Sequence, residues 1–330
     1  MMTAKPELRL LAICVGLAFA GQARANLLIT PTFDSSITSD PNAASIVSTI
    51  NSAINFYETT FSNAINVTID FKEMTTGLGT SSTTLYKVTY QGFINNLIAS
   101  SSGDATDTTA LAHLPTGANN PVTGSTTING KTANLRALGY TGIPPIGGFD
   151  GTIGLNTHLT NVGSPGSSGT YSLLAVVEHE IDEVLGLGSD LGSPGQTFFN
   201  DPAPEDLFRY DATGARSYSN NPSCGAGDGP AAYLSLDGTT KLAQFNNCAN
   251  GGDYGDWASS PLPGGVGPKV QDAFATPGSN PSLNIGSPEI VALDAIGYTL
   301  VRTVPEPTSP ALVGLSLVGL ALSRRKSSRA

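Results

Sequence analysis

Three side chains in one segment, His179, Glu180 and Glu183, have the types and the spacing found in metal-dependent hydrolases. His179 and Glu183 are four positions apart, so in a helix they lie on the same face, one turn from each other. Both offer atoms that bind zinc, and Glu180 beside them can accept a proton from water without being a ligand. The segment therefore predicts zinc-assisted hydrolysis with Glu180 as the general base.

The segment departs from the usual His-Glu-x-x-His motif, because Glu183 stands in the place of the second histidine. A carboxylate oxygen is a normal zinc ligand, but an additional anionic ligand lowers the Lewis acidity of the ion and raises the pKa of its water. We therefore expect a slower enzyme or one that works at higher pH. The alternative is a solvated polar stripe, since His/Glu pairs at this spacing also stabilise helices that bind no metal. The crowding of Glu178, Glu180, Asp182 and Glu183 favours a bound cation, which would reduce their mutual repulsion.

The elements that position these residues follow from the periodicity of the apolar side chains. A helical pattern at 171–187 carries the three residues and closes with Gly186 and Gly188, which suit a left-handed helix end. Before it, helices and strands alternate: a helix at 42–62, strands at 66–71 and 85–90, a short helix around 93–98 and a strand at 151–156. After it, turn residues dominate from 192 to 288, with a strand at 233–236 and a last short helix from Ser287. The sequence thus predicts an α+β fold with a mixed twisted sheet, an active-site helix and an irregular C-terminal half.

The two ends of the chain have the composition of targeting signals. Residues 1–25 contain Lys5 and Arg9, an apolar run, and then the small-x-small pattern at 23–25 that signal peptidase reads. At the other end, Pro305-Glu306-Pro307 precedes an apolar stretch that is too short for an ordinary membrane-spanning helix, and a basic cluster follows. This order of features resembles the PEP-CTERM sorting signal.

The PEP-CTERM resemblance implies export and processing. An exosortase in the inner membrane of a Gram-negative bacterium is expected to recognise residues 305–330 and remove them, after a transient membrane association through the short apolar helix. The alternative is an ordinary C-terminal tail anchor. We therefore divide the chain into a signal peptide (1–25), one domain (26–304) and a sorting signal (305–330), and we expect it in the periplasm and then at the cell surface or in the extracellular matrix.

Charge and cysteine content limit the functions of the middle of the chain. Residues 26–304 contain 9 basic and 24 acidic side chains, a net charge of −15. A nucleic-acid partner is therefore excluded, because phosphate binding requires a basic face. Cys224 and Cys248 remain after the leader is removed, and two cysteines in an oxidising compartment predict a disulfide between them. Serine catalysis has no support, because no Gly-x-Ser-x-Gly turn occurs.

Four segments together resemble a metzincin-like group of PEP-CTERM metalloproteases. They are 179–189, Asp206-Leu207-Phe208-Arg209-Tyr210, the stretch 252–257 and the stretch 289–298. The resemblance covers most of residues 40–300. It implies a zincin fold, a zinc ion and a protein or peptide substrate. Carried over by position, it makes His179 a ligand, Glu180 the base, Glu183 the replacement for the second ligand, and Gly186 the turn glycine.

The third metal ligand stays open at this point. The family pattern places it at Ser189, which is a poor zinc ligand. Asp190, one position further, is the first candidate, and the pair Glu205 and Asp206 is the second, with Asp201 as another acidic residue at a suitable distance along the chain. The methionine turn of the family is also missing, because every methionine of this chain precedes the ligand helix.

Four further residues have weaker functional interpretations. His158 follows the predicted strand at 151–156 and is a candidate for substrate binding, the alternative being a solvated loop histidine. Asp253 and Asp256 lie in a Gly-rich stretch that is either a calcium site or an acidic surface turn. Arg209 is placed to pair with a carboxylate near the site.

Two functions of different classes remain. The first is an exported zinc endopeptidase, favoured by the presence of Glu180 next to His179. The second is a surface or matrix protein for adhesion or biofilm assembly, which keeps the zincin fold without catalysis. The non-histidine ligand and the missing methionine turn favour this second function.

Overall fold

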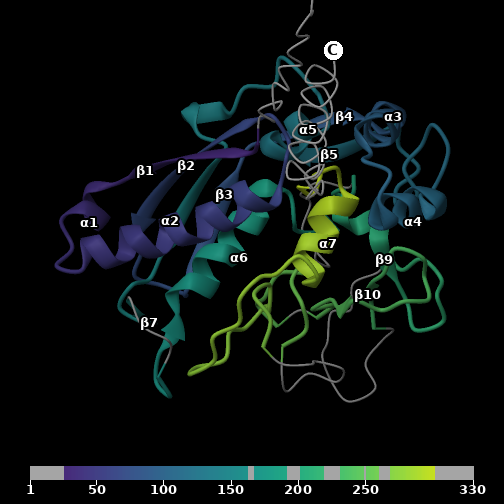
Figure 1. The fold of residues 1–330 in the computed structure, drawn as a ribbon. Helices are drawn as coiled ribbons and strands as arrows, with labels where there is room; N and C mark the ends of the chain where they lie inside the picture. Colours follow the sequence, from purple (N-terminus) through teal and green to yellow (C-terminus); the bar gives the residue numbers. More distant parts are fainter. Residues whose placement is uncertain are drawn as a thin grey trace, which may run out of the picture.

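The computed structural model describes residues 26–162, 167–191, 201–218, 231–248, 250–259 and 268–301. Over these residues the chain combines helices with several sheets in a mixed α+β fold (Figure 1). The predicted α+β class is therefore confirmed. Among the helices of these ranges, none combines the length and the apolar character needed to cross a membrane.

The largest sheet has four strands in the order β1-β2-β6-β3. They are β1 (Leu28–Phe33), β2 (Asn66–Glu73), β6 (Gly151–Leu155) and β3 (Gly79–Thr83). β1, β2 and β6 run parallel to one another, whereas β3 pairs antiparallel with β6. The sheet is mixed, as predicted, and β3 forms its edge beside β6.

Two helices cover one face of this sheet. They are α2 (Ala43–Thr60) and α6 (Leu173–Leu185), which contact each other, and α6 also contacts β3 and β6 (Figure 1). Val67, Ile69 and Phe71 of β2 are buried and alternate with less buried residues, as in a sheet with one covered face. Gly151 of β6 lets α6 approach closely, because a Cβ there would lie 2.3 Å from a methyl carbon of Val184.

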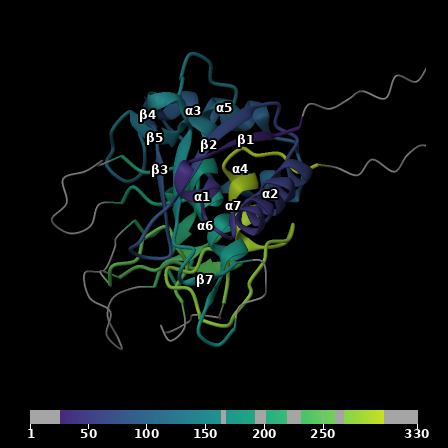
Figure 2. The same ribbon diagram turned by 90° about the vertical axis from the view of Figure 1, so that its left-hand side faces the viewer.

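A second, smaller sheet pairs β4 (Leu85–Thr89) with β5 (Thr127–Lys131) in antiparallel register. It gathers with α3 (Tyr90–Ser100) and α5 (Thr132–Ala137) at one end of the molecule, and β7 (Thr160–Asn161) lies at the other end (Figures 1 and 2). The remaining short elements of this half are α1 (Ser35–Thr38), α4 (Ala105–His113), a 3-10 turn (Ile146–Gly148) and β8 (Tyr171–Ser172).

The described residues after α6 are largely irregular, as predicted. Its described elements are a 3-10 turn (Glu205–Phe208), β9 (Arg209–Tyr210), β10 (Tyr233–Leu234), β11 (Ala243–Gln244) and α7 (Pro288–Ala295). Trp257 anchors this half, since it is 1% exposed and its indole N–H donates a 3.0 Å hydrogen bond to Glu289 Oε1. Because α7 contacts α6, the irregular half is held against the helix that carries the candidate site.

The structure confirms each predicted helix and strand, with shifts of a few residues at their ends. It also contains elements that the sequence pattern did not predict, above all β1, β3 and β5. β1 was missed because Pro31 interrupts its apolar alternation, and β3 because Gly79–Thr83 contains no apolar side chain. Both strands are defined by their neighbours in the sheet rather than by their own sequence.

Candidate metal centre

Helix α6 is well defined at both ends. Ser172 caps its N-terminus, where the side-chain oxygen accepts a hydrogen bond of 3.3 Å from Ala175 N. Gly186 ends the helix with φ +150°, and its N–H donates to the carbonyl oxygens of Asp182 and Glu183. Lys131 Nζ donates to the carbonyl oxygens of Glu183 and Leu187, which places a positive charge at the negative end of the helix. The two predicted ligands therefore sit on a rigid element.

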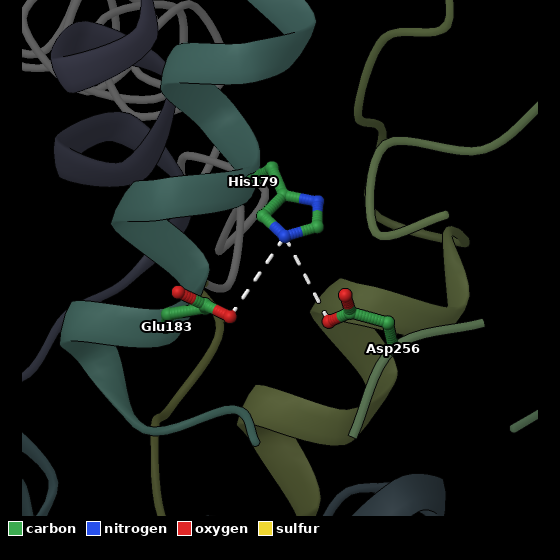
Figure 3. A group of neighbouring side chains, drawn as sticks. All are labelled: His179, Glu183 and Asp256. Atoms are coloured by element: carbon green, nitrogen blue, oxygen red, sulfur yellow. Dashed lines mark ion pairs between the residues drawn. The ribbon is translucent and has the colours of Figure 1, made fainter. Parts of the chain in front are cut away.

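The site brings together His179, Glu183 and Asp256 (Figure 3). His179 Nε2 lies 3.8 Å from Glu183 Oε1 and 3.7 Å from Asp256 Oδ1. One donor atom from each residue lies within 4.8 Å of the other two. Donors that share a tetrahedral zinc ion at about 2.0–2.2 Å are about 3.3–3.6 Å from one another. The two distances from His179 exceed this spacing by a few tenths of an ångström, and the third pair, Glu183 with Asp256, lies within 4.8 Å.

His179 and Glu183 are each oriented by a second hydrogen bond. His179 Nδ1 lies 3.0 Å from the carbonyl oxygen of Val270, which is an acceptor and therefore fixes a proton on Nδ1 and leaves Nε2 toward the site. Ser81 Oγ donates a 2.6 Å hydrogen bond to Glu183 Oε2, the oxygen that does not face His179. Supporting partners of this kind are typical of metal sites, where they set the direction of each ligand.

Asp256 comes from the irregular half of the chain, and two glycines allow it to reach α6. A Cβ on Gly255 would lie only 2.4 Å from Gly188 Cα, so the loop passes directly over the turn that ends the helix. Arg209 holds the same loop through hydrogen bonds. It is fully buried, donates 2.7 and 2.9 Å hydrogen bonds to Tyr254 O and Asn247 Oδ1, and lies 4.1 Å from the ring centre of Phe245. Arg209 therefore positions the loop; within the described part of the chain it forms no ion pair with a carboxylate, although the negative charges of Asp206 and Glu205 act on its guanidinium group.

The charges of the site favour a cation. Burial lowers the pKa of His179, but the negative charges of Asp256, Glu180 and Glu183 outweigh it and raise this pKa to about 10. Burial raises the pKa of Asp256 to about 7, although the charge of His179 opposes the shift. The carboxyl groups thus stabilise positive charge at the imidazole more strongly than water does. A metal cation bound at Nε2 would receive the same stabilisation.

Glu180, the predicted base, lies beside the cluster and is 5% exposed. Burial, followed by the charge of Glu183, raises its pKa well above the usual range, and its Oε2 has no hydrogen-bond partner. It faces strand β3, where a Cβ on Gly79 would lie 2.2 Å from Glu180 Oε1. A buried, unpartnered carboxyl oxygen next to candidate ligands is consistent with a group that would accept a proton from a water molecule bound to a cation.

A cleft of about 530 Å³ opens over these residues. Its floor contains His179, Glu180, Glu183 and Asp256, and one side is formed by residues 77–81 at the start of β3. Residues 268–270 and 272–276 also line it, and apolar surface comes from side chains that include Leu78, Leu159, Tyr171, Val176 and Phe274. The candidate ligands and the candidate base are therefore accessible from one cleft that includes residues of the edge strand β3.

The candidates for the third ligand occupy other places. The side chain of Asp190 accepts a hydrogen bond from Asn129 and lies outside the His179 cluster. Glu205 Oε2 accepts a 2.6 Å hydrogen bond from Gly188 N, and Asp206 accepts from Ser189 Oγ and from the backbone N–H of Asp190. These two residues hold the turn after α6. None of these three residues belongs to the group formed by His179, Glu183 and Asp256, so Asp256 becomes a further candidate for the third position beside the predicted Asp190, Glu205 and Asp206.

The remaining candidates are also placed. Asp201 forms a 2.9 Å ion pair with Lys87 and accepts hydrogen bonds from Thr127 and other hydroxyl groups, far from the cluster. His158 is exposed and does not line the cleft, so a direct contact with substrate there is not supported. Asp253 and Asp256 both line the cleft, and of these two predicted calcium residues Asp256 belongs to the His179 cluster. Cys224 lies outside the described residues, so its disulfide with Cys248 stays a prediction.

Sequence reasoning missed the role of Asp256, Val270 and Gln271. Gln271 Nε2 lies 2.9 Å from Asp256 Oδ1 and 3.2 Å from His179 Nε2. One signal was present, since Asp256 stands between a glycine and the single tryptophan of the chain. A glycine before Asp256 and a tryptophan after it indicate that the backbone at this point packs closely against another part of the chain. The contact partner itself is visible only in the fold.

Comparisons with known proteins identify the C-terminal signal. No curated protein and no solved structure matches the chain. The metzincin-like resemblance therefore rests on the quoted motif residues and has no support from these comparisons. Residues 303–326 match the PEP-CTERM protein-sorting motif, as the order of Pro-Glu-Pro, apolar stretch and basic cluster predicted. The chain carries the sorting signal of an exported protein that exosortase processes at the cell envelope of Gram-negative bacteria.

Proposed function

We propose that this chain is an exported metal-dependent endopeptidase, with His179, Glu183 and Asp256 as the ligands and Glu180 as the general base. The observation that carries the proposal is the convergence of these four side chains at the floor of one cleft. One imidazole and two carboxylates suit a transition metal such as zinc better than calcium, which prefers oxygen ligands alone. An ion held here would supply Lewis-acid activation of a water molecule and of the scissile carbonyl group.

Glu180 would remove the proton from the attacking water. A nearby positive charge lowers the pKa of a carboxyl group, so a bound cation would counter the burial that holds Glu180 protonated. The same side chain can then carry the proton to the leaving amine, because it lies beside the ligand helix and within the cleft. Its position against Gly79 limits its movement to this region.

The substrate would lie along strand β3. This strand is at the edge of the four-stranded sheet, and Gly79, Thr80 and Ser81 line the cleft. An edge strand offers backbone donors and acceptors to an extended peptide, which would place a peptide bond over the ligands. The apolar surface from Tyr171 and Phe274 at the cleft suits an uncharged side chain of the substrate.

Two variants test this proposal in protein purified after export. His179→Ala should lose the bound metal, whereas Glu180→Gln should retain it and lose cleavage of casein and of quenched fluorescent peptides by about 100-fold or more. Elemental analysis and peptide cleavage are measured on the same samples. Absence of a transition metal from the wild-type protein would overturn the metal centre.

The alternative function is a surface or matrix protein without catalysis. The observation in its favour is that two of the three candidate ligands are carboxylates, which make a bound ion a weaker Lewis acid. Wild-type protein that binds metal at His179 but cleaves no peptide in a broad library would decide for this alternative. Cleavage that is lost in Glu180→Gln would decide for the endopeptidase.

A further inference from the structure

Gln271 reaches the same two ligand atoms that lie nearest to each other across the site. Its Nε2 is 3.2 Å from His179 Nε2 and 2.9 Å from Asp256 Oδ1. The residue is fully buried. It comes from the segment that also supplies the Val270 carbonyl oxygen to His179 Nδ1. The amide nitrogen therefore lies close to the distance that separates two ligands of one ion, which places the side chain beside the candidate ion position.

The backbone of Gln271 is held rigidly. Its N–H donates a 3.1 Å hydrogen bond to Glu289 Oε1, and its carbonyl oxygen accepts one of 2.8 Å from Trp257 N. Glu289 Oε1 also accepts from the Trp257 indole N–H at 3.0 Å. Because Trp257 follows Asp256 directly, the hydrogen bonds among Trp257, Gln271 and Glu289 hold both Asp256 and Gln271 in place. Any change at this position is thus confined to the torsions of the Gln271 side chain.

The amide of Gln271 is only half satisfied. Its nitrogen contacts His179 and Asp256, whereas Oε1 is buried and has no hydrogen-bond partner. An unpartnered buried acceptor is unfavourable, because it has lost its hydrogen bonds with water. A half-turn about the last torsion exchanges the two ends of the amide and brings Oε1 to face the ligand atoms. A positive charge at His179 Nε2 requires this orientation, because amide N–H groups repel a cation and the amide oxygen attracts it.

We propose that Gln271 supplies a fourth protein donor, Oε1, to an ion bound by His179, Glu183 and Asp256, through a turn of its side-chain amide. This inference rests on the metal centre of the proposed function. Amide oxygen is a neutral donor, so it adds a ligand without adding to the negative charge of the two carboxylates. Gln271 would thus hold the ion more tightly and reduce its Lewis acidity less than a third carboxylate would, and the water of the proposed function would occupy a fifth coordination position.

The test compares zinc affinity, measured by competition with a chromophoric chelator, in wild type and variants. Gln271→Met removes the donor with little change in length, and we expect its zinc Kd to rise about 10- to 100-fold. Gln271→Glu keeps an oxygen donor and gains charge, so its Kd should be equal to or lower than that of wild type. Gln244→Met makes the same substitution at a half-buried position on β11, outside the cleft, and should bind zinc like wild type.

Three outcomes would contradict the proposal or the metal centre on which it rests. A Gln271→Met protein that binds zinc as tightly as wild type, or more tightly, would show that the amide is no ligand or only obstructs the ion. A Gln271→Glu protein with weaker binding would also overturn it, and this variant keeps the shape of glutamine if Gln271→Met does not fold. The visible spectrum of the cobalt-loaded proteins gives a second readout, which changes in Gln271→Met if a donor is lost. If the wild-type protein binds no metal, the proposed function is overturned. If the wild-type protein binds zinc and the Gln271 variants bind it equally well, only the role of Gln271 is overturned.

Discussion

The contact between Gly255 and the end of α6 allows the metal centre to be perturbed without changing a ligand. A Cβ on Gly255 would lie 2.4 Å from Gly188 Cα and 2.6 Å from Ser189 N. Carbon atoms in contact are about 3.5–4.0 Å apart, so Gly255→Ala must separate the two backbones by about 1 Å. Because Asp256 is the next residue, its carboxylate would move away from His179 by a similar distance.

The effect on metal affinity follows from this displacement. A shift of about 1 Å in a tightly positioned site can reduce its performance by about 100-fold. We therefore expect the zinc Kd of Gly255→Ala to rise by about 10- to 100-fold, which corresponds to about 1.4–2.7 kcal/mol of binding free energy. The added methyl group should also lower the free energy of unfolding by about 1–3 kcal/mol, as other overpacked sites do.

Chelator competition measures the zinc Kd, and circular dichroism with thermal unfolding reports whether the fold is retained. Gly169→Ala is the matched control, because a Cβ on Gly169 would meet no atom within 4 Å and its backbone is not left-handed. This control should bind zinc as wild type does. A folded Gly255→Ala protein with wild-type zinc affinity would refute the inference that the contact between Gly188 and Gly255 positions Asp256.

Three other predictions concern the base, a buried carboxyl group and an ion pair. Gly79→Ala would place a Cβ 2.2 Å from Glu180 Oε1, so kcat for peptide cleavage should fall by about 100-fold, with an unchanged zinc Kd; an unchanged kcat would contradict the role of Glu180. Burial raises the pKa of Glu205 to about 8, so the folded state binds this proton more tightly than the unfolded chain and loses stability as the pH rises from about 4.5 through 8. Glu205→Gln should therefore melt at a higher temperature than wild type at pH 9 and show a smaller advantage at pH 5; a difference that does not vary with pH would contradict this. Arg136→Met removes the partner of Asp150, which lies 2.6 Å away and is 2% exposed on its side chain, so the free energy of unfolding in urea should fall by about 3 kcal/mol, and equal stability would contradict the importance of the pair.

The ligand helix could be predicted from the sequence because its chemistry and its periodicity coincide. Apolar residues such as Val177, Ile181 and Val184 recur at helical spacing and are buried, and His179 with Glu183 falls on another face. Both signals are local, so no knowledge of the rest of the chain is required. The strands with alternating apolar residues, such as β2, were predictable for the same reason.

The third candidate ligand could not be predicted in this way. Asp256 reaches His179 through two backbone segments that touch at Gly188 and Gly255, a contact between parts of the chain that are far apart in sequence. The spacing of acidic residues after α6 instead indicated Asp190 and Asp206. Asp206 Oδ2 accepts hydrogen bonds from the backbone N–H groups of Asp190 and Ala203, and the side chain of Asp190 accepts one from Asn129. These contacts depend on the path of the chain, which the spacing of acidic residues does not reveal.

Edge strand β3 was missed for a related reason. It consists of Gly, Ser and Thr residues, and only its pairing with β6 makes it a strand. Gly79 also has to lack a side chain, because Glu180 occupies the position that a Cβ atom would take. A segment that looks like a polar turn in the sequence is therefore one wall of the candidate cleft.

The dependence of Asp256 on a distant backbone contact also determines when the centre can form. A chain in which only the N-terminal half has folded has His179 and Glu183 together on α6, but it lacks Asp256 and the Val270 carbonyl oxygen that orients the imidazole. Closing the chain between α6 and Asp256 costs entropy, which the contacts of Trp257 with Glu289 and of α7 with α6 help to offset. An ion held by all three candidate ligands would therefore require that the C-terminal half has docked. The endopeptidase proposed above would then stay without its complete ligand set until synthesis of the chain has passed α7.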